Sequence, residues 1–129
     1  MEFALAMPIV FVVLFAVFEF GLAFWRKQLL TSAVREGARA GIVATTPRPA
    51  SSYITGKVTT YLTNVGLSDP PTPTCTGTCP CTKSGQTLTV TATYPTSLAV
   101  MTNLTTLFWG STSLTASKTL SASVSMQCE

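Results

Sequence analysis

The hydrophobic pattern of the chain begins with an apolar run from Phe3 to Trp25 that is interrupted by a single charged residue, Glu19. At about 1.5 Å per residue, a helix of this length spans roughly 34 Å. This is enough to cross the hydrocarbon core of a bilayer. Carboxylates within such a segment usually have a function, so Glu19 is a candidate functional residue.

Beyond the apolar run the pattern still predicts a helix, which we expect to cover residues 1–44. No proline occurs in residues 28–44, and mostly small residues recur there at intervals of three and four. They form one stripe that can pack against a folded domain or a neighbouring helix: Leu29, Leu30, Ala33, Gly37, Ala40, Gly41 and Ala44. Pro8 removes one backbone donor and is expected to kink the helix or loosen its first turn.

A second, shorter helix is predicted after the breaker Thr45-Thr46-Pro47-Arg48-Pro49. Ser51 or Ser52 can cap its start, and Gly66 can stop it. Its apolar positions fall on one face, which we expect to cover a sheet: Ile54, Val58, Tyr61, Leu62 and Val65.

From Gln86 the pattern changes to a period of two, which predicts strands. Leu88, Val90, Ala92 and Tyr94 alternate with threonines, as in a half-buried strand with an outer hydroxyl face. A last strand places six apolar residues on one face: Leu114, Ala116, Leu120, Ala122, Val124 and Met126. Because two strands are marginal alone, we expect a third near residues 96–100, or packing on the long helix.

These elements predict an α+β fold in which a long N-terminal hydrophobic helix precedes a small antiparallel-sheet domain with a second short helix. We place the helix at residues 1–44, with the apolar residues 3–25 as a candidate membrane span, and the domain at residues 45–129. So small a domain is marginal for burying a core unaided, so cross-links or neighbours should stabilise it.

Four cysteines supply candidate cross-links: Cys75, Cys79, Cys81 and Cys128. In an exported domain they indicate two disulfides, with three possible pairings. Cys79 and Cys81 are too close for an easy mutual bridge, so Cys128 should pair with one of the other three. A zinc site is the alternative, but histidine is absent and the cysteines lack the CxxC pairs typical of zinc sites.

Charge and composition argue against two classes of function. The net charge is +3, but half of the basic residues follow the apolar run directly, so there is no broad basic face for nucleic acid. Histidine is absent, and beyond the long helix the acids are Asp69 and Glu129 alone. We therefore expect no enzymatic activity, cofactor or metal.

The basic residues also raise a question of topology. Arg26, Lys27, Arg35 and Arg39 follow the apolar run, which by the positive-inside rule would place the rest of the chain in the cytoplasm. The threonine-rich, cysteine-containing remainder instead suits an external domain. Both observations agree if a basic leader once preceded Met1 and was removed after setting the orientation.

Several short motifs together resemble the TadE-like family, pilin-like subunits of the tight-adherence branch of type IV pili. They are Glu2-Phe3-Ala4-Leu5, Glu19-Phe20-Gly21, Ala33-Val34-Arg35-Glu36-Gly37-Ala38-Arg39-Ala40, Tyr94-Pro95 closing a threonine-rich strand, and Leu107-Phe108-Trp109-Gly110. The resemblance implies that a prepilin peptidase removes a basic leader and that the helix then packs into a filament core. Type IV pilins typically carry the glutamate at the fifth mature position, so either processing differs or a few residues precede Met1.

The function expected is therefore that of a structural pilin subunit polymerising through its N-terminal helix into an extracellular type IV or Tad-like pilus. The alternative is a membrane-anchored TadE-like minor pilin or assembly factor; an adhesive module could accompany either. Expected partners are further copies of the chain in a helical filament, the prepilin peptidase and the pilus assembly machinery, with no nucleic acid. Before assembly we expect the chain in the cytoplasmic (inner) membrane.

Four residues are candidates for assembly contacts: Glu2, Glu19, Arg26 and Lys27. A carboxylate at Glu2 in an apolar core needs a positive partner, and the freed α-amine of an adjacent subunit is the best available. Glu19 could pair with Arg26 or Lys27 of a neighbour displaced by about two helical turns. Alternatively, Glu19 extends to the lipid interface and stays solvated.

Overall fold

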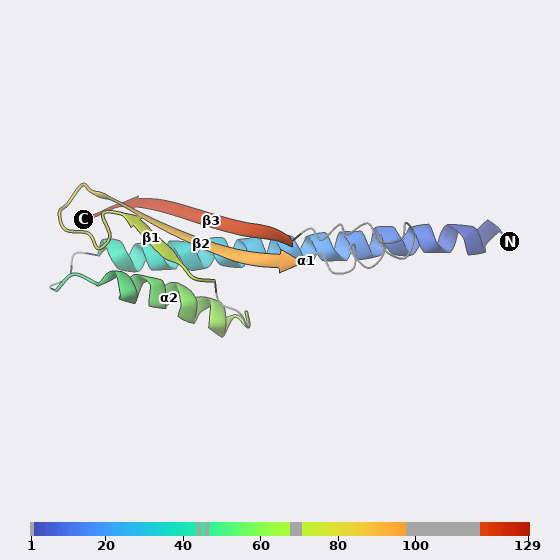
Figure 1. Cartoon of the computed structure of the whole chain (residues 1–129), viewed down its shortest axis with the longest axis horizontal. Helices are drawn as coiled ribbons and strands as arrows, with labels where there is room; N and C mark the ends of the chain where they lie inside the picture. The colour runs from blue at the N-terminus through green and yellow to red at the C-terminus, as the bar shows by residue number, and fades with distance from the viewer. Residues whose placement is uncertain (1, 44, 46, 68–70, 98–116) are drawn as a thin grey trace. The chain divides into compact units, whose positions relative to one another are not determined.

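The computed structural model describes residues 2–43, 45, 47–67, 71–97 and 117–129. The elements follow in the order α1 (Glu2–Ile42), α2 (Ser51–Asn64), β1 (Thr74–Gly77), β2 (Thr87–Ser97) and β3 (Ser117–Gln127) (Figure 1). The α+β fold is as predicted, and the helix expected to reach residue 44 ends at Ile42.

The chain forms two compact units. The first unit comprises residues 1–26 and 95–118, and the second unit comprises residues 27–94 and 119–129. The second unit thus includes the C-terminal part of α1 together with α2, β1 and most of β2 and β3. The apolar N-terminal part of α1 belongs to the first unit.

The sheet is antiparallel with the strand order β1-β2-β3. Thr74 of β1 lies opposite Thr91 of β2, and Gly77 lies opposite Leu88. Both expected supports of the two long strands are present, a third strand and packing on the long helix, but the third strand does not lie near residues 96–100. Residues 96–97 instead end β2, and residues 98–100 lie outside the described chain. The third strand is β1, which pairs with β2. Its four residues are too few to show an alternation of apolar and polar side chains in the sequence.

The two long strands show the predicted alternation. In β2, Leu88, Val90 and Ala92 are buried, whereas Thr87 and Thr93 are exposed. In β3 the apolar positions from 120 to 126 belong to the core or pack against it, and the serines between them are exposed. The predicted positions Leu114 and Ala116, and the apolar connection over residues 101–109, lie outside the described residues.

Within the second unit, α1 packs against α2 and the sheet through its small-residue stripe (Figure 1). A Cβ added to Gly41 would lie 2.7 Å from both Ile54 Cδ1 of α2 and Leu88 Cδ2 of β2. The stripe therefore packs against the chain's own domain. The apolar face of α2, expected to cover the sheet, instead meets α1 at Ile54 and Val58, although α2 also contacts β1.

The two ends of α2 differ from each other. Its N-cap is Ala50 without a side-chain cap, so the prediction that Ser51 or Ser52 caps the helix was wrong; the helix already begins at Ser51. At the other end Gly66 has a φ of +86°, and its N–H donates to the Thr63 carbonyl. Leu67 N–H donates to the Leu62 carbonyl, which completes a Schellman motif and confirms Gly66 as the stop.

Candidate assembly surface

The N-terminal part of α1 is apolar enough to cross a membrane. The segment Ala6–Ile42 contains an 18-residue window of mean hydropathy 2.4, none of which is buried within the protein. Helix α1 continues through Pro8, and the kink expected at this residue stays a prediction. Length and composition alone thus make this helix a candidate membrane span.

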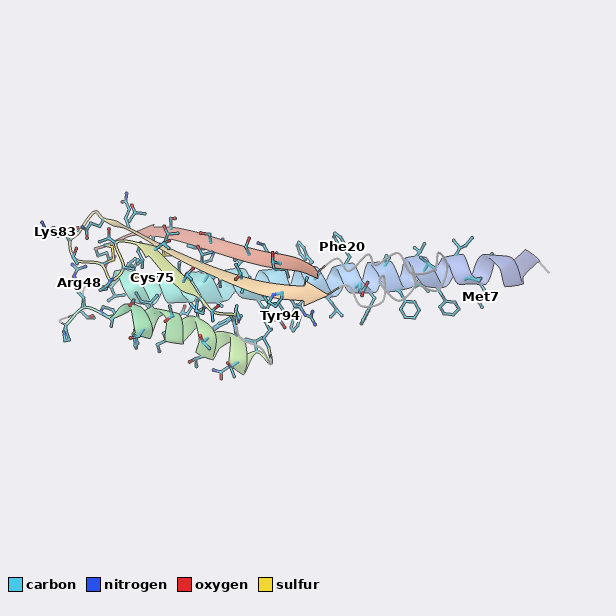
Figure 2. The ribbon with its side chains drawn as sticks, viewed as in Figure 1. Met7, Phe20, Arg48, Cys75, Lys83 and Tyr94 are labelled. Carbon is cyan, nitrogen blue, oxygen red and sulfur yellow. A yellow bond between two sulfur atoms is a disulfide. The ribbon has the colours of Figure 1, made fainter. Side chains whose placement is uncertain are left out.

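Large apolar side chains of this segment are exposed. Phe20 is 76% exposed, Val17 67% and Phe18 66%. Figure 2 shows the Met7 and Phe20 side chains projecting outward from α1. Phe11 and Phe15, one turn apart, stack with ring centroids 6.3 Å apart. Exposed apolar surface of this extent indicates contact with lipid or with other proteins.

A shallow hollow interrupts this apolar surface. It is lined by Ala16, Val17, Phe20, Gly21 and Phe24, all from α1. Its position coincides with Gly21, where a Cβ would meet no atom of the described residues within 4 Å. Glu19, next to the hollow in sequence, is partly buried.

The two basic residues after the apolar run make hydrogen bonds within the chain. In the first unit, Arg26 Nη1 donates to Thr96 Oγ1 at 3.2 Å, and Thr96 is buried. In the second unit, Lys27 Nζ donates to the backbone carbonyl of Ser121 in β3. Sequence reasoning missed both acceptors because each lies about 70 or more positions away along the chain. Any pairing of Glu19 with Arg26 or Lys27 of a neighbour stays a prediction.

Glu2, the other assembly candidate, is the first residue of α1. Its backbone position is described, but its side chain is among those that the structure leaves undescribed. The predicted partner of Glu2, an α-amine of another subunit, therefore stays a prediction.

The four cysteines form two disulfides, as predicted. Cys75 pairs with Cys79, and Cys81 pairs with Cys128, so Cys128 does take one of the other three. All four thiols are thereby engaged, and the alternative of a cysteine zinc site was wrong. The Cys81–Cys128 bridge is buried, whereas Cys75 and Cys79 are partly exposed.

Hydrogen bonds reinforce the attachment of the C-terminal residues. Cys128 N–H donates to the Gln86 carbonyl at 2.7 Å, and Gly85 N–H donates to the Cys128 carbonyl at 2.9 Å. Arg48 Nη2 donates to the backbone oxygen of Glu129 at 3.1 Å. The second unit is therefore closed by covalent and polar contacts as well as by its core.

The outer face of the sheet carries hydroxyl groups in pairs. Thr89 Oγ1 lies 2.9 Å from Ser125 Oγ, and Thr91 Oγ1 lies 3.0 Å from Ser123 Oγ. Such cross-strand hydroxyl pairs stabilise neighbouring strands and fix their register. They bear out the outer hydroxyl face expected for β2.

One family model matches the chain: residues 1–39 correspond to the model described as TadE-like protein. Over these residues the chain is similar to TadE-like proteins. The resemblance expected from the sequence is thus confirmed for this segment. No curated protein and no solved structure matches the chain.

The matched residues 1–39 contain the main features of the candidate assembly surface. It includes the exposed apolar residues, the hollow at Gly21, and all four predicted assembly residues. It also reaches Gly37, where α1 packs within the second unit. The disulfides and the sheet lie outside the matched residues.

Proposed function

We propose that this chain is a structural pilin subunit that polymerises through α1 into an extracellular Tad-like pilus. The observation that carries the proposal is the difference in burial between the two parts of α1. Residues such as Leu30 and Val34 are fully buried in the second unit, whereas Val17 and Phe20 expose most of their surface. A helix anchored in a folded domain at one end and unburied at the other is suited to packing against further subunits.

In this role the second unit forms the outer surface of the filament. Its two disulfides suit an oxidising exterior. Its exposed hydroxyl face interacts with water without needing a protein partner. Before assembly the apolar part of α1 would hold the chain in the inner membrane, where the prepilin peptidase and the pilus machinery would act on it.

The alternative is a membrane-anchored minor pilin or assembly factor. The length and hydropathy of the Ala6–Ile42 segment favour it equally, because a helix that stays in lipid also exposes its apolar side chains. The two functions differ in where most of the chain accumulates. A polymer subunit is the main component of surface filaments, whereas an assembly factor stays with the membrane.

Shearing the cells and separating filaments from membranes tests the proposal. We expect the wild-type chain to be the main protein of the sheared filaments. Phe18→Ala should lower its filament yield about ten-fold, as truncation of a packed aromatic does at interfaces, while leaving membrane insertion intact. Tyr53→Ala, which truncates a 51% exposed aromatic of α2, is the matched control and should assemble normally.

Two results would contradict the polymer function. One is a wild-type chain found in the membrane fraction with only traces in filaments, which is the distribution of an assembly factor. The other is a wild-type filament yield from Phe18→Ala, because a helix in the filament core should not tolerate the loss of a large packed side chain.

A further inference from the structure

The two outer edges of the sheet differ in how far their backbone groups are already bonded. The strand order is β1-β2-β3, so among the described strands β1 and β3 each have one unpaired edge. β1 has only four residues, and the Cys75–Cys79 disulfide closes a short loop at its end. Within this loop Cys79 N–H donates to the Gly77 carbonyl. The edge of β1 is therefore short and partly capped.

The outward groups of β3 follow from its pairing with β2. Thr89 and Ser125 lie side by side through their hydroxyl groups, and in the same register Cys128 N–H donates to the Gln86 carbonyl. In an antiparallel pair the backbone groups of alternate residues point to the neighbouring strand. The even-numbered residues of β3 therefore bond to β2, and the N–H and carbonyl groups of its odd-numbered residues point away from β2.

Lys27 marks one end of the open part of this edge. Its Nζ donates to the carbonyl of Ser121, which is an odd-numbered residue and so agrees with the assignment. Beyond it, no backbone hydrogen bond among the described residues involves the outward groups of Ser123, Ser125 and Gln127. All three residues are exposed and belong to the second unit. Each thus offers one N–H and one carbonyl, on the side of the sheet away from α2 (Figure 1).

The open part of β3 lacks the usual protection of an edge strand. Natural sheets block their edges with charged residues, proline, bulges or a covering segment. Residues 119–127 contain no charged residue, no proline and no glycine. On the inner face Val124 and Met126 are only partly buried, although they pack against the core. A further strand at this edge would therefore bond to backbone groups and also cover apolar surface.

We propose that residues 123–127 of β3 pair with the same residues of a second copy of the chain, antiparallel and related by a two-fold axis at Ser125. Ser125 of one copy then faces Ser125 of the other, and Ser123 of each copy faces Gln127 of the other. The outward N–H and carbonyl groups of the two strands bond to each other, which is how an added strand extends an exposed sheet edge. The two-fold axis closes the contact, so it joins two copies and no more.

The edge of β3 is complementary to itself. In this register Val124 meets Met126 on the inner face, while hydroxyl and amide side chains meet on the outer face, and such matched pairs stabilise neighbouring strands. Because the stretch is uncharged, two copies bring no like charges together. A register shifted toward Ser121 would need the carbonyl that Lys27 already binds. The pairing requires neither a membrane nor packing of α1, so it does not rest on the proposed function.

Cysteine cross-linking of the full chain in detergent tests the pairing and its register. The Cα atoms of facing residues in such a pair lie about 5.5 Å apart. The two copies of Ser123 are instead offset along the strands by roughly 14 Å, at about 3.4 Å per residue. With a short thiol-specific cross-linker, Ser125→Cys should form a covalent dimer. Ser123→Cys, on the same exposed face, is the matched control and should give about ten-fold less dimer because of this offset.

A second comparison tests whether the backbone makes the contact. In the Ser125→Cys background, Ser123→Pro removes an outward N–H without removing a bond to β2. It should reduce the dimer to the level of the Ser123→Cys control, whereas Ser123→Ala keeps the N–H and should leave the yield unchanged. Circular dichroism shows whether the proline variant folds.

Three results would overturn the proposal. They are equal cross-linking of Ser125→Cys and Ser123→Cys, cross-links from Ser125→Cys to other proteins only, and an undiminished dimer in a folded Ser123→Pro variant. Association through α1 alone would not favour position 125 over position 123. If the proline variant does not fold, the comparison of the two cysteine variants decides by itself.

Discussion

Gly37 of α1 lies so close to Val58 of α2 that a methyl group at position 37 would overlap the Val58 Cγ2 atom. We therefore expect Gly37→Ala to destabilise the second unit by about 1–3 kcal/mol, because overpacking forces neighbouring side chains or the backbone to move. Thermal unfolding of the full chain in detergent, followed by circular dichroism, measures the effect.

The control for this prediction should change stability in the opposite direction. Gly56 is helical but has free space around it, so Gly56→Ala should raise the free energy of unfolding by roughly 0.5–1 kcal/mol. If both substitutions stabilise the protein equally, the close contact between Gly37 and Val58 is wrong.

The two disulfides should contribute unequally to stability. Cys81–Cys128 joins residues 47 positions apart, whereas Cys75–Cys79 joins residues only 4 apart. The chain-entropy relation then assigns about 4 kcal/mol to the first bridge and about 2 kcal/mol to the second. Denaturant unfolding of the two double cysteine-to-alanine variants should show this order. Intact mass under non-reducing conditions should find no free thiol in the wild type, and a reversed order or alkylatable thiols would contradict the assignment.

Lys27 should stabilise the attachment of β3 to α1 through its hydrogen bond to the Ser121 carbonyl. Lys27→Met keeps the apolar stem but removes the donor, so a loss of about 1 kcal/mol is expected. Lys83→Met, at an exposed residue of the loop before β2, is the control and should change stability little. Faster amide hydrogen exchange along β3 in Lys27→Met alone would locate the effect, and equal exchange in both variants would argue against it.

Glu2 is expected to fix the register of assembly. If its carboxylate pairs with the α-amine of an adjacent subunit in an apolar core, its removal leaves that amine buried without a partner. Glu2→Ala should then abolish or slow filament formation while export and processing continue. The measurement is the ratio of filament to processed membrane protein, and a wild-type ratio would count against the register function.

Glu19 is the candidate for a bridge between subunits. Glu19→Gln should weaken filaments, and exchanging the charges of Glu19 and Arg26 should partly restore them. The exchange also removes the Arg26 hydrogen bond to Thr96, so Arg26→Glu alone is needed for comparison. A filament structure with no basic nitrogen within about 4 Å of the Glu19 carboxylate would exclude the bridge.

The sequence by itself determined the elements whose signal is local. The apolar run identified the long helix, the alternation around Leu88 and Val90 identified β2, and Gly66 identified the end of α2. In a helix every third or fourth residue lies on the same face, and in a strand every second residue does. The residue types at these positions then show which face is apolar and which is polar.

Only the tertiary structure decided which distant groups meet. The partner of Cys128, the packing of Val58 against Gly37 and the acceptors of Arg26 and Lys27 all depend on how segments far apart in sequence are brought together. The strand β1 was missed for the same reason. Its four residues show no alternation of apolar and polar side chains, and its pairing with β2 is visible only in the folded chain. The sequence already placed Gly37 and Gly41 in a stripe of small residues, but only the three-dimensional packing showed that they lie against Val58, Ile54 and Leu88.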